Sequence, residues 1–151
     1  MIVHDTFTIE RIYDTSLARL YEAWADPAIK NQWFGGHEGW TELERKNDFR
    51  VGGVDISHGR HVSGFESRCV ATYRVIVPNE RIVFVYDLHV DGALLSVTLA
   101  TAAFASKGRS AQLSYTEQSV YFDTPFAPAD KGPAGRKQGT EQLLDLLARV
   151  V

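Results

Sequence analysis

From Trp40 to Phe122 the chain is a nearly continuous series of β-forming segments, with predicted helices only before and after it. Hydrophobic and β-branched residues are concentrated in these segments, and the breaks between them are rich in Gly, Asn, Asp and Pro. The segments cover residues 43–45, 49–56, 67–77, 81–90, 94–105 and 111–122. Helices kept apart from an antiparallel sheet indicate an α+β fold.

The residues before this series predict one strand and two short helices. Residues 6–13 alternate in polarity, which is typical of a strand. Asp26-Pro27 predicts a helix start, because Asp caps a helix and Pro is tolerated at its first position; Gly35-Gly36 predicts its end. The preceding helix is predicted from the spacing i, i+3, i+4 and i+7 of Leu17, Leu20, Tyr21 and Trp24. The residues before it, Asp14, Thr15 and Ser16, all offer N-cap side chains.

The last segment predicts a long amphipathic helix. Its helical stripe consists of Leu143, Leu146, Leu147 and Val150. Continued towards the N-terminus, the same stripe presents small or polar groups at Arg136, Gly139 and Thr140, a pattern suited to the floor of a cavity. We therefore expect one domain over residues 1–151, a curved antiparallel sheet of about seven strands wrapped around this helix.

Three connections are predicted from local composition. Gly52-Gly53 inside a predicted strand indicates a bulge or sharp bend. Residues 57–64 and residues 125–133 are expected to be loops. Asp91-Gly92 between two β-forming segments is typical of a two-residue hairpin turn.

Composition excludes several classes of function. The net charge is −3, and no cluster of Lys or Arg forms a phosphate-binding stripe, so nucleic acid is not an expected partner. The least polar stretch, residues 94–105, is far shorter than the ~20 residues that span a bilayer. A secretory signal is not visible, and Cys69 is the only cysteine. These features predict a cytoplasmic protein that does not bind membranes.

With these elements placed, the chain resembles the START-like, SRPBCC superfamily, whose architecture is called the helix-grip fold. More closely, it resembles the homologues of the heat-shock chaperone ATPase activator. The resemblance covers nearly the whole chain and is carried by the sequences at 23–27, 32–35, 48–53, 76–84 and 139–148. It departs at Gly139-Thr140, where many family members have Gly-Trp.

The resemblance implies a deep, mostly apolar internal pocket. Relatives bind lipids, polyketides or aromatic compounds, and a minority catalyse cyclisation or related steps. The superfamily thus implies a ligand-binding cavity but does not identify the ligand.

Aromatic and polar residues around the expected pocket are the candidate ligand contacts. Trp24 is assigned to the core because it lies within a helical stripe. Trp33 and Phe34 are consecutive and must diverge, so one is expected to point inward and the other towards the mouth. The full predicted set is Trp33, Phe34, Trp40, Phe84, Tyr86, Tyr115, Glu117, Arg136, Gly139, Thr140 and Leu143.

Glu117 is the one candidate for chemistry. It shares a strand face with Leu113 and Tyr115, the face with the apolar start expected of the interior. There it would be a polar anchor or a general acid/base. The alternative is that a bulge shifts the alternation and leaves Glu117 at the surface.

The remaining reactive residues predict neither a metal site nor a nucleophile. His58 and His61 are placed in a predicted loop, with His37 and His89 elsewhere, and no second close pair supplies further zinc ligands. Cys69 reads as a small buried hydrophobe. No cofactor is indicated, and the sequence does not identify an enzyme.

Three functions remain open from the sequence. The first is binding of a small hydrophobic ligand, aromatic, polyketide-like or lipid-like, between the sheet and the last helix. The second is a cyclase- or hydrolase-type enzyme that uses Glu117 as acid/base. The third is an interaction module that associates with a chaperone or, as a homodimer, with its own copy through a sheet edge.

Overall fold

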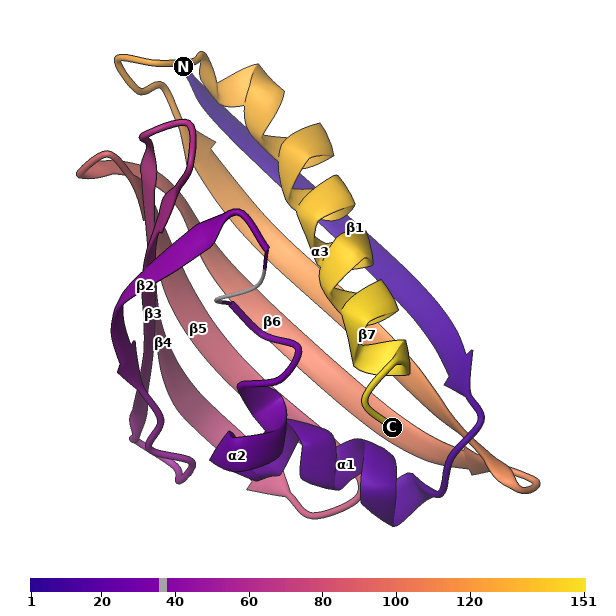
Figure 1. The fold of residues 1–151 in the computed structure, drawn as a ribbon. Coiled ribbons are helices and arrows are strands. Elements are labelled where there is room, and N and C mark those ends of the chain that lie inside the picture. The colour runs from indigo at the N-terminus through magenta and orange to yellow at the C-terminus, as the bar shows by residue number, and fades with distance from the viewer. Residues whose placement is uncertain (36–37) are drawn as a thin grey trace.

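The computed structural model describes residues 1–35 and 38–151. A seven-stranded antiparallel sheet curves around one long helix, α3, which crosses its concave face, while two short helices, α1 and α2, lie near one end of the sheet (Figure 1). This is the helix-grip architecture expected from the sequence. The cavity described below lies between the sheet and α3.

The strands are hydrogen-bonded in the order β1-β7-β6-β5-β4-β3-β2, so the first and second strands form the two edges. Their bounds are β1 Ile2–Tyr13, β2 Trp40–Lys46, β3 Val54–His61, β4 Glu66–Val77, β5 Arg81–Val90, β6 Ala93–Lys107 and β7 Ser110–Phe122. The helices are α1 Leu17–Ala25, α2 Pro27–Lys30 and α3 Gly132–Ala148, with a 3-10 turn, η1, at Ala129–Lys131.

The two short helices begin at the predicted caps. The side chain of Ser16 accepts a hydrogen bond of 3.1 Å from the backbone N–H of Arg19, and the Asp26 side chain accepts one of 2.9 Å from that of Ala28. These bonds satisfy backbone donors that a first helical turn leaves unpaired. The second helix ends at Lys30, before Gly35, and Gly36 lies outside the described residues.

The prediction of a loop over residues 57–64 is wrong for its first half. Residues up to His61 continue β3, which pairs with β2 on one side and with β4 on the other. Two neighbouring strands supply the hydrogen bonds that local composition does not favour. Packing accounts for the glycine at position 59, because a Cβ there would lie 3.2 Å from the indole of Trp40.

Gly52-Gly53 forms a turn and not a bulge inside a strand, because β3 begins only at Val54. Gly52 has φ +82°, a left-handed conformation that glycine adopts without strain. A Cβ at Gly53 would lie 2.0 Å from the carbonyl oxygen of Asp48. Both glycines are therefore required by the turn that leads into the strand.

The long helix starts within the segment expected to be a loop, at Gly132, and its buried face is shifted from the predicted stripe. Thr140, Leu144 and Leu147 are buried, whereas Leu143 and Leu146 are partly buried. The buried line therefore runs through Leu144, which the predicted stripe did not include. No helix in the described part of the chain combines the length and apolar character needed to cross a membrane.

Candidate functional site

A cavity of about 260 Å³ lies between the concave face of the sheet and α3. This volume is close to the lower end, about 300 Å³, of typical ligand pockets, which suits a small molecule. Its wall includes residues from α1, α2, α3 and strands β2 to β5 and β7: Trp24, Lys30, Trp33, Phe34, Gly35, Trp40, Glu42, Asp55, Ser57, His58, Gly59, Ser67, Cys69, Ala71, Tyr73, Phe84, Tyr86, Leu88, Tyr115, Glu117, Arg136, Gly139, Thr140, Gln142, Leu143 and Leu144.

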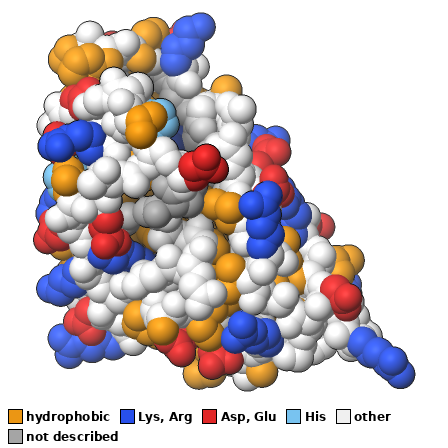
Figure 2. Space-filling model, viewed as in Figure 1, with side chains coloured by type: hydrophobic (Ala, Val, Ile, Leu, Met, Phe, Trp, Pro, Cys, Tyr) orange, Lys and Arg blue, Asp and Glu red, His pale blue; other side chains and the backbone are white. Residues whose placement is uncertain are grey.

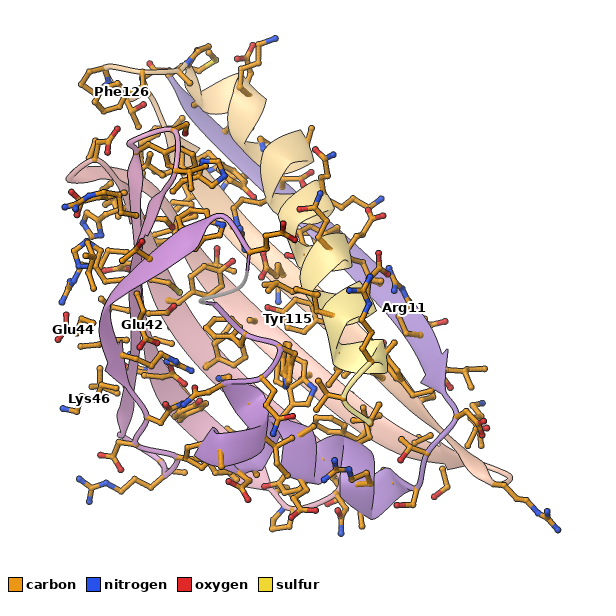
Figure 3. The ribbon with its side chains drawn as sticks, in the orientation of Figure 1. Arg11, Glu42, Glu44, Lys46, Tyr115 and Phe126 are labelled. Atoms are coloured by element: carbon orange, nitrogen blue, oxygen red, sulfur yellow. The ribbon has the colours of Figure 1, made fainter. Side chains whose placement is uncertain are left out.

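All eleven residues predicted as ligand contacts line this cavity. In Figure 3, Tyr115 lies between the sheet and α3, whereas Phe126 lies near the N-terminal end of that helix. The structure thus brings the predicted residues together around one space. Ligand contact by any of them stays a prediction.

Trp24 and Trp33 form the apolar wall at the α1 side of the cavity. Trp33 is 2% exposed, its ring centroid lies 5.0 Å from that of Trp24, and its indole N–H donates a 2.9 Å hydrogen bond to the carbonyl of Ala23. Trp24 is a core residue, as predicted. Phe34 diverges from Trp33 and is half-buried, so Trp33 is the inward-pointing member of this consecutive pair.

Glu117 points into the interior. Its pairing with β1 and β6 shows no register shift, and the residue is 1% exposed, which excludes the surface alternative. One carboxylate oxygen, Oε2, accepts hydrogen bonds from the hydroxyls of Tyr115 at 2.6 Å and Tyr86 at 2.8 Å. A buried carboxylate needs such donors, because burial without them is costly.

Arg136 completes this group from the opposite side of the cavity. Its Nη2 donates a 3.1 Å hydrogen bond to the Tyr86 hydroxyl, which in turn donates to Glu117. Burial and the neighbouring Glu117 raise the pKa of Tyr115 well above its usual value. Burial also raises the pKa of Tyr86, against the opposing effect of Arg136. Both phenols therefore remain protonated donors over the physiological pH range.

A second polar cluster, which the sequence did not reveal, lines the cavity beside α2. The ammonium of Lys30 lies 2.9 Å from Oδ2 of Asp55 and 3.1 Å from the hydroxyl of Tyr73. Arg45 pairs with the other carboxylate oxygen. Lys30 and Asp55 are 7% and 3% exposed, so this is a buried ion pair with a second cation beside it.

The charges of this second cluster stabilise one another. Burial would raise the pKa of Asp55, but Lys30 and Arg45 outweigh it and lower the pKa. Burial would likewise lower the pKa of Lys30, and Tyr73 and Asp55 reverse that effect. A Lys and an Asp 25 residues apart carry no local pattern that could have predicted their contact.

His58 and His61 have protein partners, whereas Nδ1 of His89 is buried without a hydrogen-bond partner in the described part of the chain. Nε2 of His58 lies 2.9 Å from Oε1 of Glu66, and the ring of His61 stacks on Phe65 at 5.1 Å between centroids. His37 lies outside the described residues. Trp40 packs edge-on against both His61 and Phe65, and so joins the cavity wall to an aromatic pair at the end of β3 and in the turn that follows it.

A second hollow, of about 380 Å³, is surrounded by charged and polar side chains. Its residues belong to or follow β3, β4 and β5, and Arg68 pairs across the sheet with both His58 and His89. His58 is shared between this hollow and the wall of the internal cavity. It offers no apolar enclosure and consists of His58, Glu66, Arg68, His89, Asp91 and Gly92.

Figure 2 shows the face on which α3 and β2 lie. Hydrophobic side chains there form small groups separated by charged ones. Association with a chaperone or with a second copy of the chain stays a prediction.

Solved structures of other proteins share this fold. A protein from Rhizobium loti, Mll3558, has 37% sequence identity and a TM-score of 0.88 over 100% of this chain and 99% of that one. A protein from Rhizobium leguminosarum has 35% identity and a TM-score of 0.90 over 99% of this chain and 95% of that one. DynU16, from the dynemicin biosynthetic locus, has 16% identity and a TM-score of 0.68 over 96% and 46%, and shows the fold alone.

No protein with a curated description matches this chain. The family model described as "Activator of Hsp90 ATPase homolog 1-like protein" matches residues 14–151, most of the chain, and this family lies within the START-like, SRPBCC superfamily. The chain therefore belongs to the Activator of Hsp90 ATPase homolog 1-like family.

Proposed function

We propose that this protein binds a small, largely apolar molecule in the cavity between its sheet and α3. The observation that carries the proposal is a cavity of about 260 Å³ with aromatic walls and a few polar groups. Ligand pockets typically combine these two features. Apolar area removed from water would supply affinity at about 25 cal/mol per Å², and the group around Glu117 would orient the molecule.

Native mass spectrometry of protein purified from its own host tests this proposal. The expected spectrum contains a second species, heavier than the chain by the mass of one small molecule, which is lost on denaturation. Extraction then gives its chemical class. Protein that is free of any such species under all growth and purification conditions would count against ligand binding.

A variant that fills the cavity gives an independent test. Leu143 lines the cavity and is partly buried, so Leu143→Trp would occupy the space that a ligand needs. Leu146→Trp changes the same residue type on the same helix, at a position outside the cavity wall, and serves as the control. The retained small molecule is expected to disappear from the Leu143 variant and to persist in the Leu146 variant.

The hydrogen bonds of Glu117 favour a second candidate function, acid/base catalysis on the bound molecule. The carboxylate is buried, faces the cavity and is joined to Tyr115, Tyr86 and Arg136, an arrangement that can hold and move a proton. If catalysis occurs, a candidate substrate is converted by the wild type, while Glu117→Gln still binds it and leaves its mass unchanged. If wild type and Glu117→Gln converted the candidate substrate at the same rate, a catalytic role for Glu117 would be excluded.

A further inference from the structure

The cavity wall contains buried polar atoms that have no hydrogen-bond partner among residues 1–35 and 38–151. They are Oε1 of Glu117, Oγ1 of Thr140 and Nε of Arg136, with Nε1 of Trp24 as a fourth. Glu117 is 1% and Thr140 4% exposed. Buried polar groups in proteins are nearly always paired, and leaving one unpaired is costly. Several such atoms in one cavity therefore point to a polar group on the molecule that occupies it.

Two of these atoms, Oε1 of Glu117 and Nε of Arg136, belong to side chains of one hydrogen-bonded group. The Tyr86 hydroxyl bridges Glu117 and Arg136 through hydrogen bonds of 2.8 and 3.1 Å. Arg136 and Thr140 are four residues apart on α3 and so lie on the same helical face. The side chains that carry these three atoms thus belong to one hydrogen-bonded group and to the next turn of the same helix, all in the wall of one cavity.

The chemistry of these atoms limits what that group can be. A carboxylate oxygen only accepts hydrogen bonds, Nε of arginine only donates, and a threonine hydroxyl does both. Building on the ligand-binding function proposed above, we infer that the ligand is a neutral compound with a hydroxyl group on an apolar ring system. Its O–H donates to Oε1 of Glu117, and its oxygen accepts from Thr140.

Charge balance selects the neutral form. Glu117 and Arg136 are opposite charges joined through Tyr86. Asp55 pairs with both Lys30 and Arg45, and Glu42 is a third carboxylate in the wall, so three carboxylates stand against three cations. A ligand carboxylate would add an unbalanced negative charge beside Oε1 of Glu117, a residue that is itself buried. A hydroxyl supplies the missing donor without adding charge.

Three probes with one ring system separate these contributions: 2-naphthol, 2-methoxynaphthalene and 2-naphthoate, titrated calorimetrically at neutral pH into the intact chain. The first has a hydroxyl donor, the second only an ether oxygen, and the third a negative charge. Hydrogen bonds to charged groups are among the stronger ones, so wild type should bind 2-naphthol about tenfold or more tightly than 2-methoxynaphthalene. It should bind 2-naphthoate most weakly.

Glu117→Gln tests the assignment to this residue. In glutamine the carbonyl oxygen can keep the hydrogen bonds from Tyr86 and Tyr115, which places the amide NH₂, a donor, at the former Oε1 position. The preference for 2-naphthol over 2-methoxynaphthalene should then vanish or reverse. A residue that merely supported the fold would weaken all probes equally. Glu10→Gln, the same change at an exposed position of β1, should leave the preference intact.

Thr140→Val supplies a second variant, should the first fail to fold. It keeps the side-chain shape and removes the hydroxyl, so binding of both 2-naphthol and 2-methoxynaphthalene should weaken by about three- to tenfold, with recovery in Thr140→Ser. Equal binding of these two probes by wild type, or a preference that survives Glu117→Gln, would overturn the hydroxyl inference and leave ligand binding in place. Failure of all three probes to bind would overturn the inference and count against the proposed ligand class as well.

Discussion

The hydroxyl of Tyr115 donates a 2.6 Å hydrogen bond to the carboxylate of Glu117, two residues further along β7 on the same face of the sheet. The two side chains are neighbours because strand residues two apart point the same way. This contact places a charged group inside a protein of mostly apolar core and fixes the orientation of its unpaired oxygen. The catalytic proposal and the inference of a ligand hydroxyl both depend on this relationship.

Removing this hydroxyl should cost more than removing a comparable one elsewhere. Tyr115→Phe deletes a bond to a charged acceptor and should lower the free energy of unfolding by about 1.5–3 kcal/mol. Tyr13→Phe deletes a buried 3.0 Å bond to the neutral carbonyl of Leu144, which should cost about 0.5–1.5 kcal/mol. Urea unfolding of both variants gives the comparison. A smaller loss for Tyr115→Phe would show that Glu117 does not depend on this donor.

The ion pair beside α2 should be asymmetric in its contribution to stability. Asp55→Asn leaves the buried cations Lys30 and Arg45 without their counter-charge, and should cost about 3–5 kcal/mol. Lys30→Met leaves Asp55 still paired with Arg45, so its cost should be clearly smaller. Thermal and urea unfolding measure both, and equal losses would contradict the role assigned to Arg45.

The same pair predicts a pH dependence of stability. The pKa of Asp55 is lowered from 3.8 in the folded protein, so its contribution is present above that value and is lost as the pH falls through the folded-state pKa. The stability difference between wild type and Asp55→Asn should therefore shrink in acid. The pKa of Lys30 is raised from 10.5, so the difference between wild type and Lys30→Met should be full below that pH and shrink above it. Differences that stay constant across both ranges would exclude the assigned shifts.

Two glycines of α3 should respond oppositely to alanine. A Cβ at Gly132 would lie 2.2 Å from the ring of Tyr121, which is fully buried, so Gly132→Ala should destabilise by about 1–3 kcal/mol. At Gly135 nothing lies within 4 Å of the added Cβ, and Gly135→Ala should stabilise by about 0.5–1 kcal/mol through helix propensity. Chemical denaturation measures the change in the free energy of unfolding for each variant. Stabilisation at both positions would mean that the helix start can shift away from the sheet.

Cys69 should be an unreactive thiol that reports on the cavity. Burial raises its pKa to about 12, and it lines the internal space. Labelling of Cys69 with iodoacetamide at neutral pH should be far slower than labelling of a solvent-exposed thiol. Little thiolate is present, and access requires opening of the cavity. A bound molecule should slow it further. Rapid labelling of the folded protein would show that the cavity opens readily to solvent.

The sequence by itself determined the elements with strong local signals. The capping residues Ser16 and Asp26 and the helical spacing around Trp24 set the short helices, since these effects act within a few residues. The alternation along β7 placed Tyr115 and Glu117 on the apolar side, because that strand has no register shift with either neighbour. The cavity-facing set followed from these periodicities together with the family resemblance.

The tertiary structure alone decided what depends on distant partners. His58 and Gly59 belong to a strand because β2 and β4 hydrogen-bond them on both sides, although their own composition favours a loop. Lys30 and Asp55 tolerate burial only because the fold brings them together. The space between sheet and α3, and the unpaired oxygen of Glu117 within it, result from sheet curvature and helix placement, which no local pattern encodes.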